Sequence, residues 1–236
     1  MIDVIFLSYS KTKELYEMTK TAIRSLVDNN PEFDFNICVV QTVDNKFGDA
    51  EYFGGGVQVI HPNIRFHYND FLKLAYKQME HKSKVILISN DDVYYRKGSI
   101  KELLSGTKHF MVCSSKNPDS RFNRGLQSKY TTGYHKGYRT SEHFSGWSHL
   151  INKDIFKYID VEDFWHSNFG GYFQDNWICH LGMIHNVPMG LCADSVVEHR
   201  ESVSSPHTTD GEYFNMRQNK IFEQTKKSYA QRKKDL

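Results

Sequence analysis

The sequence of 236 residues contains few cysteines and lacks any long hydrophobic run. Its four cysteines form no C-x-x-C pair, which argues against a structural zinc site and favours free thiols in a reducing compartment. No segment approaches the ~20 apolar residues that a membrane-spanning helix needs. The first residues, MIDVIFLSYSK, have neither the basic start nor the apolar length of a secretory signal. We therefore expect a cytoplasmic protein without a transmembrane segment.

An excess of either charge is also missing, since 30 Lys and Arg residues stand against 28 Asp and Glu residues. This balance excludes a large field of one sign but allows local patches. The hydrophobic content of 39% is enough to bury a core, which excludes a disordered chain. Internal repeats, low-complexity segments and Pro- or Gly-rich linkers are absent as well. We therefore expect one domain over residues 1–236.

Apolar runs and amphipathic segments alternate in the first half of the chain. Val- and Ile-rich runs predict strands at 3–10, 35–42, 57–61, 84–89 and 109–115. Helical spacing of apolar residues predicts helices at 13–28, at 70–80 with Asn69 as the N-cap, and near 99–104. This alternation predicts an α/β fold with a mostly parallel central sheet flanked by helices.

The second half is less regular. Residues 121–139 predict a long loop, rich in basic and aromatic residues. Strands are expected at 143–151 and 190–199, and helices at 153–159, 174–185 and 212–228, the last followed by the basic tail QRKKDL. In the helix 174–185 we expect four apolar side chains to face inward, namely Trp177, Ile178, Leu181 and Ile184.

Three polar residues, Asn90, Asp91 and Asp92, directly follow the apolar run VILIS. In an open parallel sheet, ligands bind outside the carboxyl ends of the strands. Two adjacent carboxylates repel each other unless a positive group lies nearby. Mg²⁺ or Mn²⁺ supplies that charge, prefers oxygen ligands and binds diphosphates. The alternative is a polar turn in which one Asp caps the next helix, and this stretch alone leaves both interpretations open.

The segment YNDFLKLAYKQMEHKSKVILISNDDVYYRKGSI resembles the centre of a family-2-type glycosyltransferase with the GT-A fold. There, a helix opened by Asn precedes a strand that ends in a D-x-D-like triplet, and Asn90 departs from that triplet at its first position. The resemblance continues in order through FSGWSHLINKDIF, YFQDNWICHLGMIHNVP and SVVEHRESVSS. It implies a single GT-A-like domain: residues 1–115 bind the nucleotide sugar, 116–210 bind the acceptor, and 211–236 form a C-terminal helix and tail.

The resemblance implies a reaction in which an acceptor hydroxyl displaces a nucleoside diphosphate from a sugar. Asp92, assisted by Asp91 and His199, would hold Mn²⁺ or Mg²⁺. Asp175 would be the general base, because the start of a helix favours its ionised form, and the expected stereochemistry is inversion by single displacement. The alternatives are an ordinary surface histidine at His199 and a purely structural N-terminal carboxylate at Asp175.

The resemblance also implies two sets of substrate contacts. The acceptor or the transferred sugar would meet Gly146, Trp147 and Gln174, although Trp147 fits the core equally well. The ends of the first two strands would flank the base and ribose of a nucleotide-sugar donor, with a UDP-sugar expected. The donor-binding residues would be Ser8, Tyr9, Ser10, Asp44, Arg65, Asn69 and Asn90; several of them suit plain strand-end turns just as well.

The acceptor is either a glycan or a nucleic acid. The loop 121–139 has five basic residues and several tyrosines, which suits phosphates and stacked bases. An enzyme that glycosylates hydroxylated DNA bases is therefore an alternative, but the near-neutral net charge favours a glycan. A non-catalytic nucleotide-sugar-binding relative is a further alternative. A nucleotidyltransferase is disfavoured because FLSYSKTKELY has no Gly-rich loop.

Overall fold

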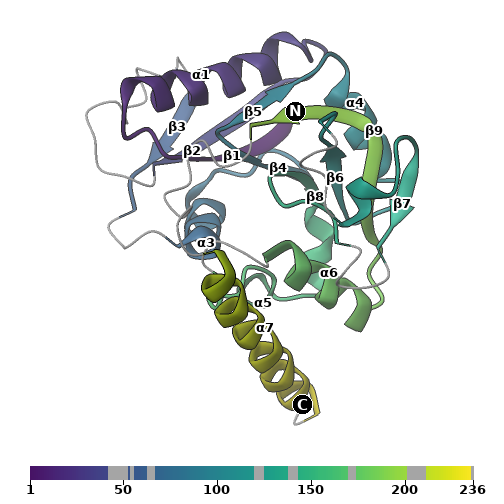
Figure 1. Ribbon diagram of the computed structural model, residues 1–236. Coiled ribbons are helices and arrows are strands. Elements are labelled where there is room, and N and C mark those ends of the chain that lie inside the picture. Colours follow the sequence, from purple (N-terminus) through teal and green to yellow (C-terminus); the bar gives the residue numbers. More distant parts are fainter. Residues whose placement is uncertain are drawn as a thin grey trace.

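The computed structural model describes residues 1–41, 53, 56–62, 67–119, 125–137, 143–169, 174–200 and 211–234. Asp44 and Arg65, both expected to bind the donor, lie outside these residues, as do three of the loop cations, Arg121, Arg124 and Arg139. Figure 1 shows a central sheet with helices on both sides of it.

Nine strands form the sheet in the described part of the chain, in the order β3-β2-β1-β4-β8-β6-β9-β5, with β7 also paired to β9. Their bounds are β1 Ile2–Ser8, β2 Phe35–Gln41, β3 Val57–Ile60, β4 Val85–Asn90, β5 Val93–Tyr95, β6 Val112–Lys116, β7 Tyr134–Lys136, β8 Ser148–Asn152 and β9 Met189–His199. The helices are α1 Lys13–Asp28, α3 Tyr68–Gln78, α4 Ser99–Gly106, α5 Val161–Phe164, α6 Gln174–Ile184 and α7 Gly211–Lys234, with 3-10 turns η2 Gly125–Ser128 and η4 Lys153–Lys157.

The α/β fold is confirmed, and the first half of the sheet is parallel: β1 pairs parallel with β2 and β4, and β2 with β3. The second half is mixed, since β8 runs antiparallel to β4 and β6, and β9 pairs antiparallel with β5 and β7. Only Asp91 and Asp92 separate β4 from β5. A connection of two residues is too short for a parallel crossover, so β5 turns away and pairs with β9.

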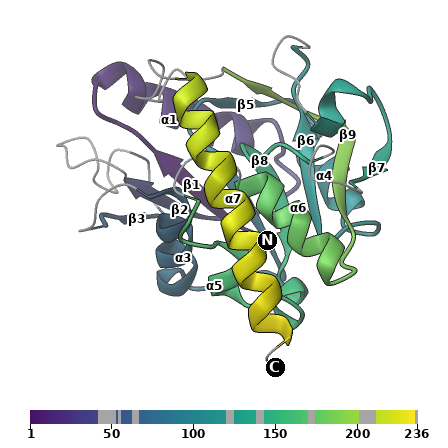
Figure 2. The ribbon, with the colours of Figure 1, turned by 60° about the horizontal axis from the view of Figure 1, so that its bottom comes forward.

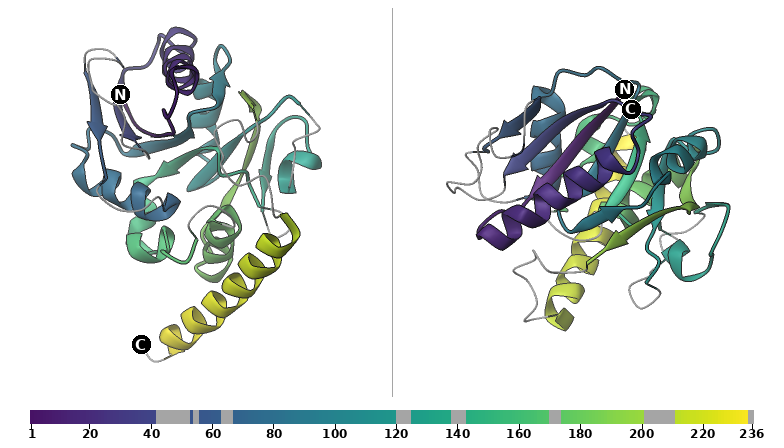
Figure 3. Two further views of the ribbon diagram at one scale, coloured as in Figure 1. Left: turned by 60° about the vertical axis from the view of Figure 1, so that its left-hand side comes forward. Right: turned by 90° about the horizontal axis from the view of Figure 1, so that it is seen from above.

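Strand β1 is buried along its whole length because helices cover both faces of the sheet. Val4 and Phe6 pack into the apolar cluster that includes α1 and α4. Ile5 and Leu7 point the other way, into the cluster that includes α3, α6 and α7. The left view of Figure 3 shows α1 and α7 on opposite sides of the sheet. This double coverage explains why β1 is an unbroken apolar run.

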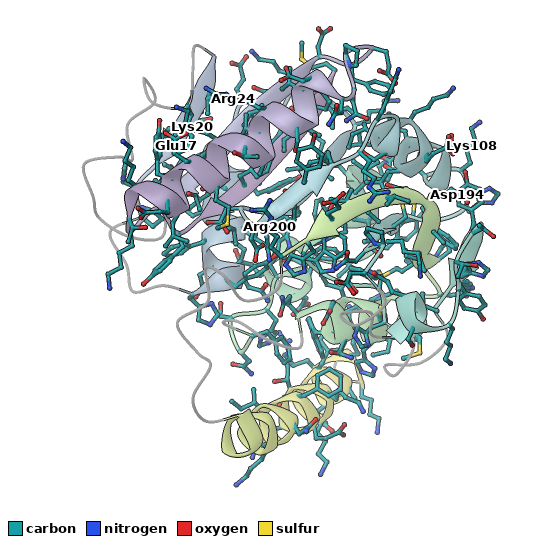
Figure 4. All side chains as sticks on the ribbon, turned by 45° about the horizontal axis from the view of Figure 1, so that its top comes forward. Glu17, Lys20, Arg24, Lys108, Asp194 and Arg200 are labelled. Carbon is teal, nitrogen blue, oxygen red and sulfur yellow. The ribbon has the colours of Figure 1, made fainter. Side chains whose placement is uncertain are left out.

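Helix α1 exposes a polar face to solvent, and Figure 4 shows Glu17, Lys20 and Arg24 along it. Its buried face carries Ala22, Ile23 and Leu26 among others, so the bounds and the amphipathic pattern predicted at 13–28 are confirmed. Thr12 caps the helix, its hydroxyl accepting a hydrogen bond from the Leu15 amide.

Asp3 anchors the end of β1 that is remote from the strand carboxyl ends. Its buried carboxylate accepts hydrogen bonds from Asn36 Nδ2 at 2.8 Å, from the Lys82 amide at 3.0 Å and from Lys153 Nζ at 3.0 Å. Burial raises the pKa of Asp3, but these donors outweigh it and hold the pKa below its ordinary value. The carboxylate thereby links β1 to β2, to the start of β4 and to the end of β8.

The prediction of Asn69 as an N-cap is wrong. Helix α3 begins at Tyr68, and His67 caps it, its Nδ1 accepting a hydrogen bond from the Asp70 amide. Asn69 lies inside the first turn, fully buried, and its Nδ2 donates to the carbonyl of His166 at 3.0 Å. The imidazole of His67 therefore caps the helix, although sequence rules favour a short polar side chain such as Asn at an N-cap.

The prediction for the inner face of α6 is confirmed for Trp177, Ile178 and Leu181, which are buried, and wrong for Ile184, which is 45% exposed. Ile184 is the last residue of the helix. Gly182, two residues earlier, packs closely on Val187 and Met189. The segment that follows the helix therefore covers the Gly182 side of its last turn and leaves Ile184 exposed.

Two further elements differ from the prediction. The described part of 121–139 is not a plain loop, because it contains η2 and also β7, which pairs with β9 from Tyr134 to Lys136. The C-terminal helix extends to Lys234, so most of the basic tail is helical. Lys and Arg in a last turn suit the negative end of the helix dipole.

Helix α7 lies alongside α6 (Figure 2). It packs through the buried side chains of Phe222, Thr225 and Tyr229, and the Tyr229 ring meets Trp177 edge-on at 5.5 Å. Figure 1 shows its C-terminal end pointing away from the sheet. Within the described residues, no helix combines the length and apolar character needed to span a membrane.

Candidate active site

The carboxyl ends of β1 and β4 meet at one edge of the sheet, because the two strands are parallel neighbours with Leu7 opposite Asn90. Asp91, which follows β4, accepts a hydrogen bond on Oδ2 from the amide of Tyr9 at 2.6 Å. Asn90 donates its amide to the carbonyl of Trp147 at 2.9 Å. The polar triplet is therefore tied to the segment after β1 and to the turn before β8.

Asp92 and His199 form a buried pair at this edge. Strands β5 and β9 pair with Val93 opposite His199, and the Arg200 amide donates to the Asp92 carbonyl at 2.9 Å. His199 Nε2 consequently lies 3.2 Å from Asp92 Oδ1. Despite this proximity, Asp92 Oδ1 and His199 Nδ1 make no hydrogen bond with any described residue, although both atoms are buried.

Trp147 fixes the plane of the His199 ring. Its indole stacks on the imidazole with ring centroids 4.9 Å apart and an interplanar angle of 11°. The sequence suggested Trp147 as a stacking plane for a sugar, or alternatively as core. In the structure one face of the indole covers His199, and the side chain also packs against the α1 cluster. Orientation of the imidazole is the role that this contact supports.

Gly146 allows the start of α6 to approach the turn before β8. A Cβ at this position would lie 3.4 Å from Asp175 Cβ and 3.5 Å from Gln174 Nε2. Asp175 Oδ1 accepts the Asn176 amide at 2.8 Å, and the carboxylate remains 19% exposed. Gln174 Oε1 is buried without a hydrogen-bond partner among the described residues. The structure therefore brings Gly146 and Gln174, both predicted to meet the acceptor or the sugar, next to Asp175, the predicted base.

Tyr68, which the sequence pattern did not indicate, contacts both the polar triplet after β4 and the turn before β8. Its hydroxyl lies 3.4 Å from both Asn90 Oδ1 and the Gly146 carbonyl. Burial raises the pKa of Tyr68, and the negative charges of Asp175 and Asp92 raise it further. The phenol is therefore neutral at physiological pH and close enough to both carboxylates to feel their charge.

His149 supports the same turn from inside the sheet. It is fully buried, with Nδ1 2.9 Å from the Gly146 carbonyl. Burial lowers the pKa of His149 from 6.5 to about 4, opposed by that hydrogen bond. The unfolded chain takes up this proton near pH 6.5 but the folded protein does so only near pH 4. The contribution to stability is therefore complete above pH 6.5 and is lost as the pH falls toward 4.

We predict that His149→Asn flattens this pH dependence. The asparagine amide can still donate to the Gly146 carbonyl but does not titrate. Between pH 7 and 5, the wild-type protein should lose about 2 kcal/mol more of its unfolding free energy than the variant. Urea denaturation of both proteins at the two pH values measures the difference. Equal losses would show that His149 is not buried in its neutral form.

Three predicted donor-binding residues are engaged inside the protein. The hydroxyl of Ser8 contacts the hydroxyls of Ser10 at 2.6 Å and Thr19 at 2.8 Å, and all three residues are fully buried. Ser8 and Ser10 thus tie the end of β1 to α1, and Asn69 ties α3 to the His166 carbonyl. Tyr9, between the two serines, is half-buried. Sequence alone does not distinguish such internal contacts from ligand contacts.

Two more residues at the site were missed. His143 lies with Nε2 3.9 Å from Asp175 Oδ2, and Arg200, an exposed cation, directly follows His199 at the end of β9 (Figure 4). Arg200 lies within SVVEHRESVSS, one of the segments that resemble the glycosyltransferase family, and His143 directly precedes another, FSGWSHLINKDIF. Their sequence signal is weak because the chain contains 12 histidines and 30 basic residues.

The residues present fit a divalent cation. Among the described residues, no three His, Cys, Asp or Glu side chains converge as a metal-binding group, but Asp92 and His199 form a buried oxygen–nitrogen pair whose Asp92 Oδ1 accepts no hydrogen bond. Mg²⁺ at phosphate sites is typically held by one or two carboxylates and completes its shell with phosphate oxygens and water. Asp92 supplies such a carboxylate, and His199 adds a nitrogen beside it.

No protein-family model and no curated protein sequence matches this chain. Solved glycosyltransferase structures do match it. Residues 1–349 of TarS from S. aureus match with a TM-score of 0.58 and 15% identity over 83% of this chain and 59% of that one. TarS in complex with UDP-GlcNAc gives 0.57, 13%, 83% and 57% in the same order. GalNAc-T7 with UDP, GalNAc and Mn²⁺ gives 0.61, 10%, 84% and 43%.

These matches establish the fold. The chain has the GT-A fold of these glycosyltransferases, as the resemblance in its sequence implied. It spans less than two thirds of each of these three chains. At 10–15% identity the likeness extends to the fold alone, and the function has to be argued from the site.

Proposed function

We propose that the protein is a metal-dependent glycosyltransferase that moves a sugar from a nucleoside-diphosphate sugar to an acceptor hydroxyl with inversion. One observation carries the proposal: Asp92, paired with His199 at the end of β4, and Asp175, at the start of α6, both lie near Tyr68, whose hydroxyl contacts Asn90 and Gly146. A UDP-sugar is the expected donor, and the UDP-GlcNAc and UDP bound by the matching structures support this class.

Asp92 and His199 are the residues that would hold Mn²⁺ or Mg²⁺, with Trp147 keeping the imidazole in its plane. A bound cation would neutralise the charge that develops on the departing diphosphate. Asp91 has one oxygen committed to the Tyr9 amide and so holds the segment that would meet the nucleotide base, while the same carboxylate would assist Asp92 at the cation. Arg200 adds an exposed positive charge beside the same edge.

Asp175 would act as the general base. It takes the proton of the acceptor hydroxyl while the oxygen forms a bond to the anomeric carbon and the bond from that carbon to the diphosphate breaks. It lies in the first turn of α6, near the positive end of the helix dipole. A base on one side of the sugar and a cation-bound leaving group on the other require a single displacement, hence inversion.

A glycan hydroxyl is the acceptor that we favour. The net charge of +2 gives little of the basic surface that a DNA-modifying enzyme uses, and extruding a base from a duplex costs a few kcal/mol. Of the five cations of the 121–139 segment, two belong to the described residues: Lys129 directly follows η2, and Lys136 is the last residue of β7.

A panel of nucleotide sugars with Mn²⁺ tests the donor class. One donor is expected to raise Tm by about 5 °C at a concentration near 100 times its Kd, and EDTA should abolish the shift. Diphosphate release should follow when a glycan acceptor is added. A Tm shift without diphosphate release for any acceptor would indicate a non-catalytic relative. Diphosphate release only with DNA that contains hydroxylated bases would indicate a DNA-modifying enzyme. The absence of a Tm shift with every donor would overturn the proposal.

A further inference from the structure

We propose that His143 is a positioning residue for the Asp175 carboxylate. The inference rests on the proposed function, because Asp175 is a base only in that reaction. His143 lies just before β8 and approaches α6 from the side of η2, and its ring nitrogen Nε2 is 3.9 Å from Asp175 Oδ2. The two side chains are exposed by 18% and 19%, so both are partly accessible to solvent.

The neighbouring residue Asn176 determines which nitrogen of His143 carries the proton. Asn176 Nδ2 lies 3.0 Å from His143 Nδ1. An amide nitrogen is a donor, so Nδ1 must accept, and the neutral ring carries its proton on Nε2. The N–H of Nε2 therefore faces the carboxylate of Asp175.

The two oxygens of Asp175 have different surroundings. Oδ1 accepts the backbone amide of Asn176 at 2.8 Å, which leaves Oδ2 on the side of His143. A distance of 3.9 Å is longer than a hydrogen bond. Catalytic hydrogen bonds are often long in ligand-free sites and shorten once the substrate is bound. We expect the Nε2–H donor to hold Oδ2 in the direction from which the acceptor hydroxyl is deprotonated.

His143 is fixed by the backbone as well as by Asn176. Its carbonyl accepts the Leu126 amide at 3.0 Å. Gly125 has a φ of +55°, and a Cβ there would lie 2.3 Å from the same carbonyl oxygen. Glycine is therefore required for η2 to close on His143. A histidine locked by a side-chain amide, a backbone amide and a glycine contact has the rigidity that a positioning residue needs.

Two other titratable groups near Asp175 are neutral. Among the described residues, Tyr68 from α3 and Cys179 from α6 both feel its charge, and burial is the main cause that raises the pKa of each. Neither can supply a positive charge to the carboxylate. His143 is therefore the residue that directs a ring N–H at Asp175 from outside α6.

Two variants separate positioning from packing. His143→Asn can still accept from Asn176 but presents nothing to Asp175, whereas the longer amide of His143→Gln can donate at the place of Nε2. We expect kcat of His143→Asn to fall about tenfold or more, part of the 10²- to 10⁴-fold that a base contributes. The acid limb of its kcat profile should move up by about one pH unit, while KM for the donor changes less than about twofold.

His143→Gln should stay within about threefold of the wild-type kcat. If His143 is merely structural, both variants lose activity and Tm together and the acid limb does not move, which overturns the proposal. The ¹⁵N resonances of the imidazole give a readout that needs no turnover. We expect the Nε2–H tautomer in the wild type and its loss in Asn176→Leu.

The NMR result separates this inference from the proposed function. The opposite tautomer in an enzyme that transfers sugar would refute the role of His143 alone. The expected tautomer in a wild-type protein that turns over no nucleotide sugar would refute the proposed function, and with it the catalytic role of His143.

Discussion

Replacing Asp175 with asparagine is expected to lower kcat for sugar transfer by about 10²- to 10⁴-fold. The amide has nearly the same shape and its oxygen can still accept the Asn176 amide, so α6 should begin as before. The amide cannot take up the proton of the acceptor hydroxyl, and this is the step that the substitution removes. Diphosphate release gives kcat, and the thermal shift with donor and Mn²⁺ gives binding, which should be unchanged.

Asp28→Asn is a matched control for this experiment. Asp28 is the exposed last residue of α1, and the change removes the same charge from the protein away from the site. Its kcat is expected to equal that of the wild type. If Asp175→Asn transfers sugar at the rate of this control, Asp175 is not the base, whatever the binding data show.

Replacing Asp92 with asparagine is expected to remove the Mn²⁺ dependence of donor binding. An amide oxygen is a weaker ligand than a carboxylate, and Asp92 is one of the two residues proposed to hold the cation. Loss of electrostatic stabilisation at the departing diphosphate should lower kcat/KM by about 10²-fold or more. Calorimetric titration of Mn²⁺ in the presence of UDP measures the binding directly.

The Asp92 variant has a clear contrary outcome. In the wild type, Mn²⁺ should tighten UDP binding, and in the variant UDP should bind equally with and without the metal. If Mn²⁺ still strengthens UDP binding to Asp92→Asn as it does to the wild type, the cation is held elsewhere. Because Asp92 and His199 are both buried, Tm without ligand should be compared first, to show that the variant is folded.

The parts of this protein that sequence predicts well are those set by local pattern. The helix at 13–28 and the strands up to 84–89 have regular apolar periods, and the structure confirms them with bounds that differ by at most a few residues. The resemblance to GT-A glycosyltransferases rested on the order of several short motifs, and the fold confirms it. The predictions of Asn69 as an N-cap and of Ile184 as an inner residue were wrong, because a cap and an inner face depend on neighbours from other elements.

The sequence by itself determined that a carboxylate pair ends a buried strand, and that a second acidic position, Asp175, opens a later helix. Tertiary structure decided which side chains meet there. The antiparallel pairing of β5 with β9 places His199 beside Asp92 although they are far apart in sequence. Tyr68 and His143 join the site through packing between elements. Such contacts depend on strand register and close approach, which no local pattern of residues encodes.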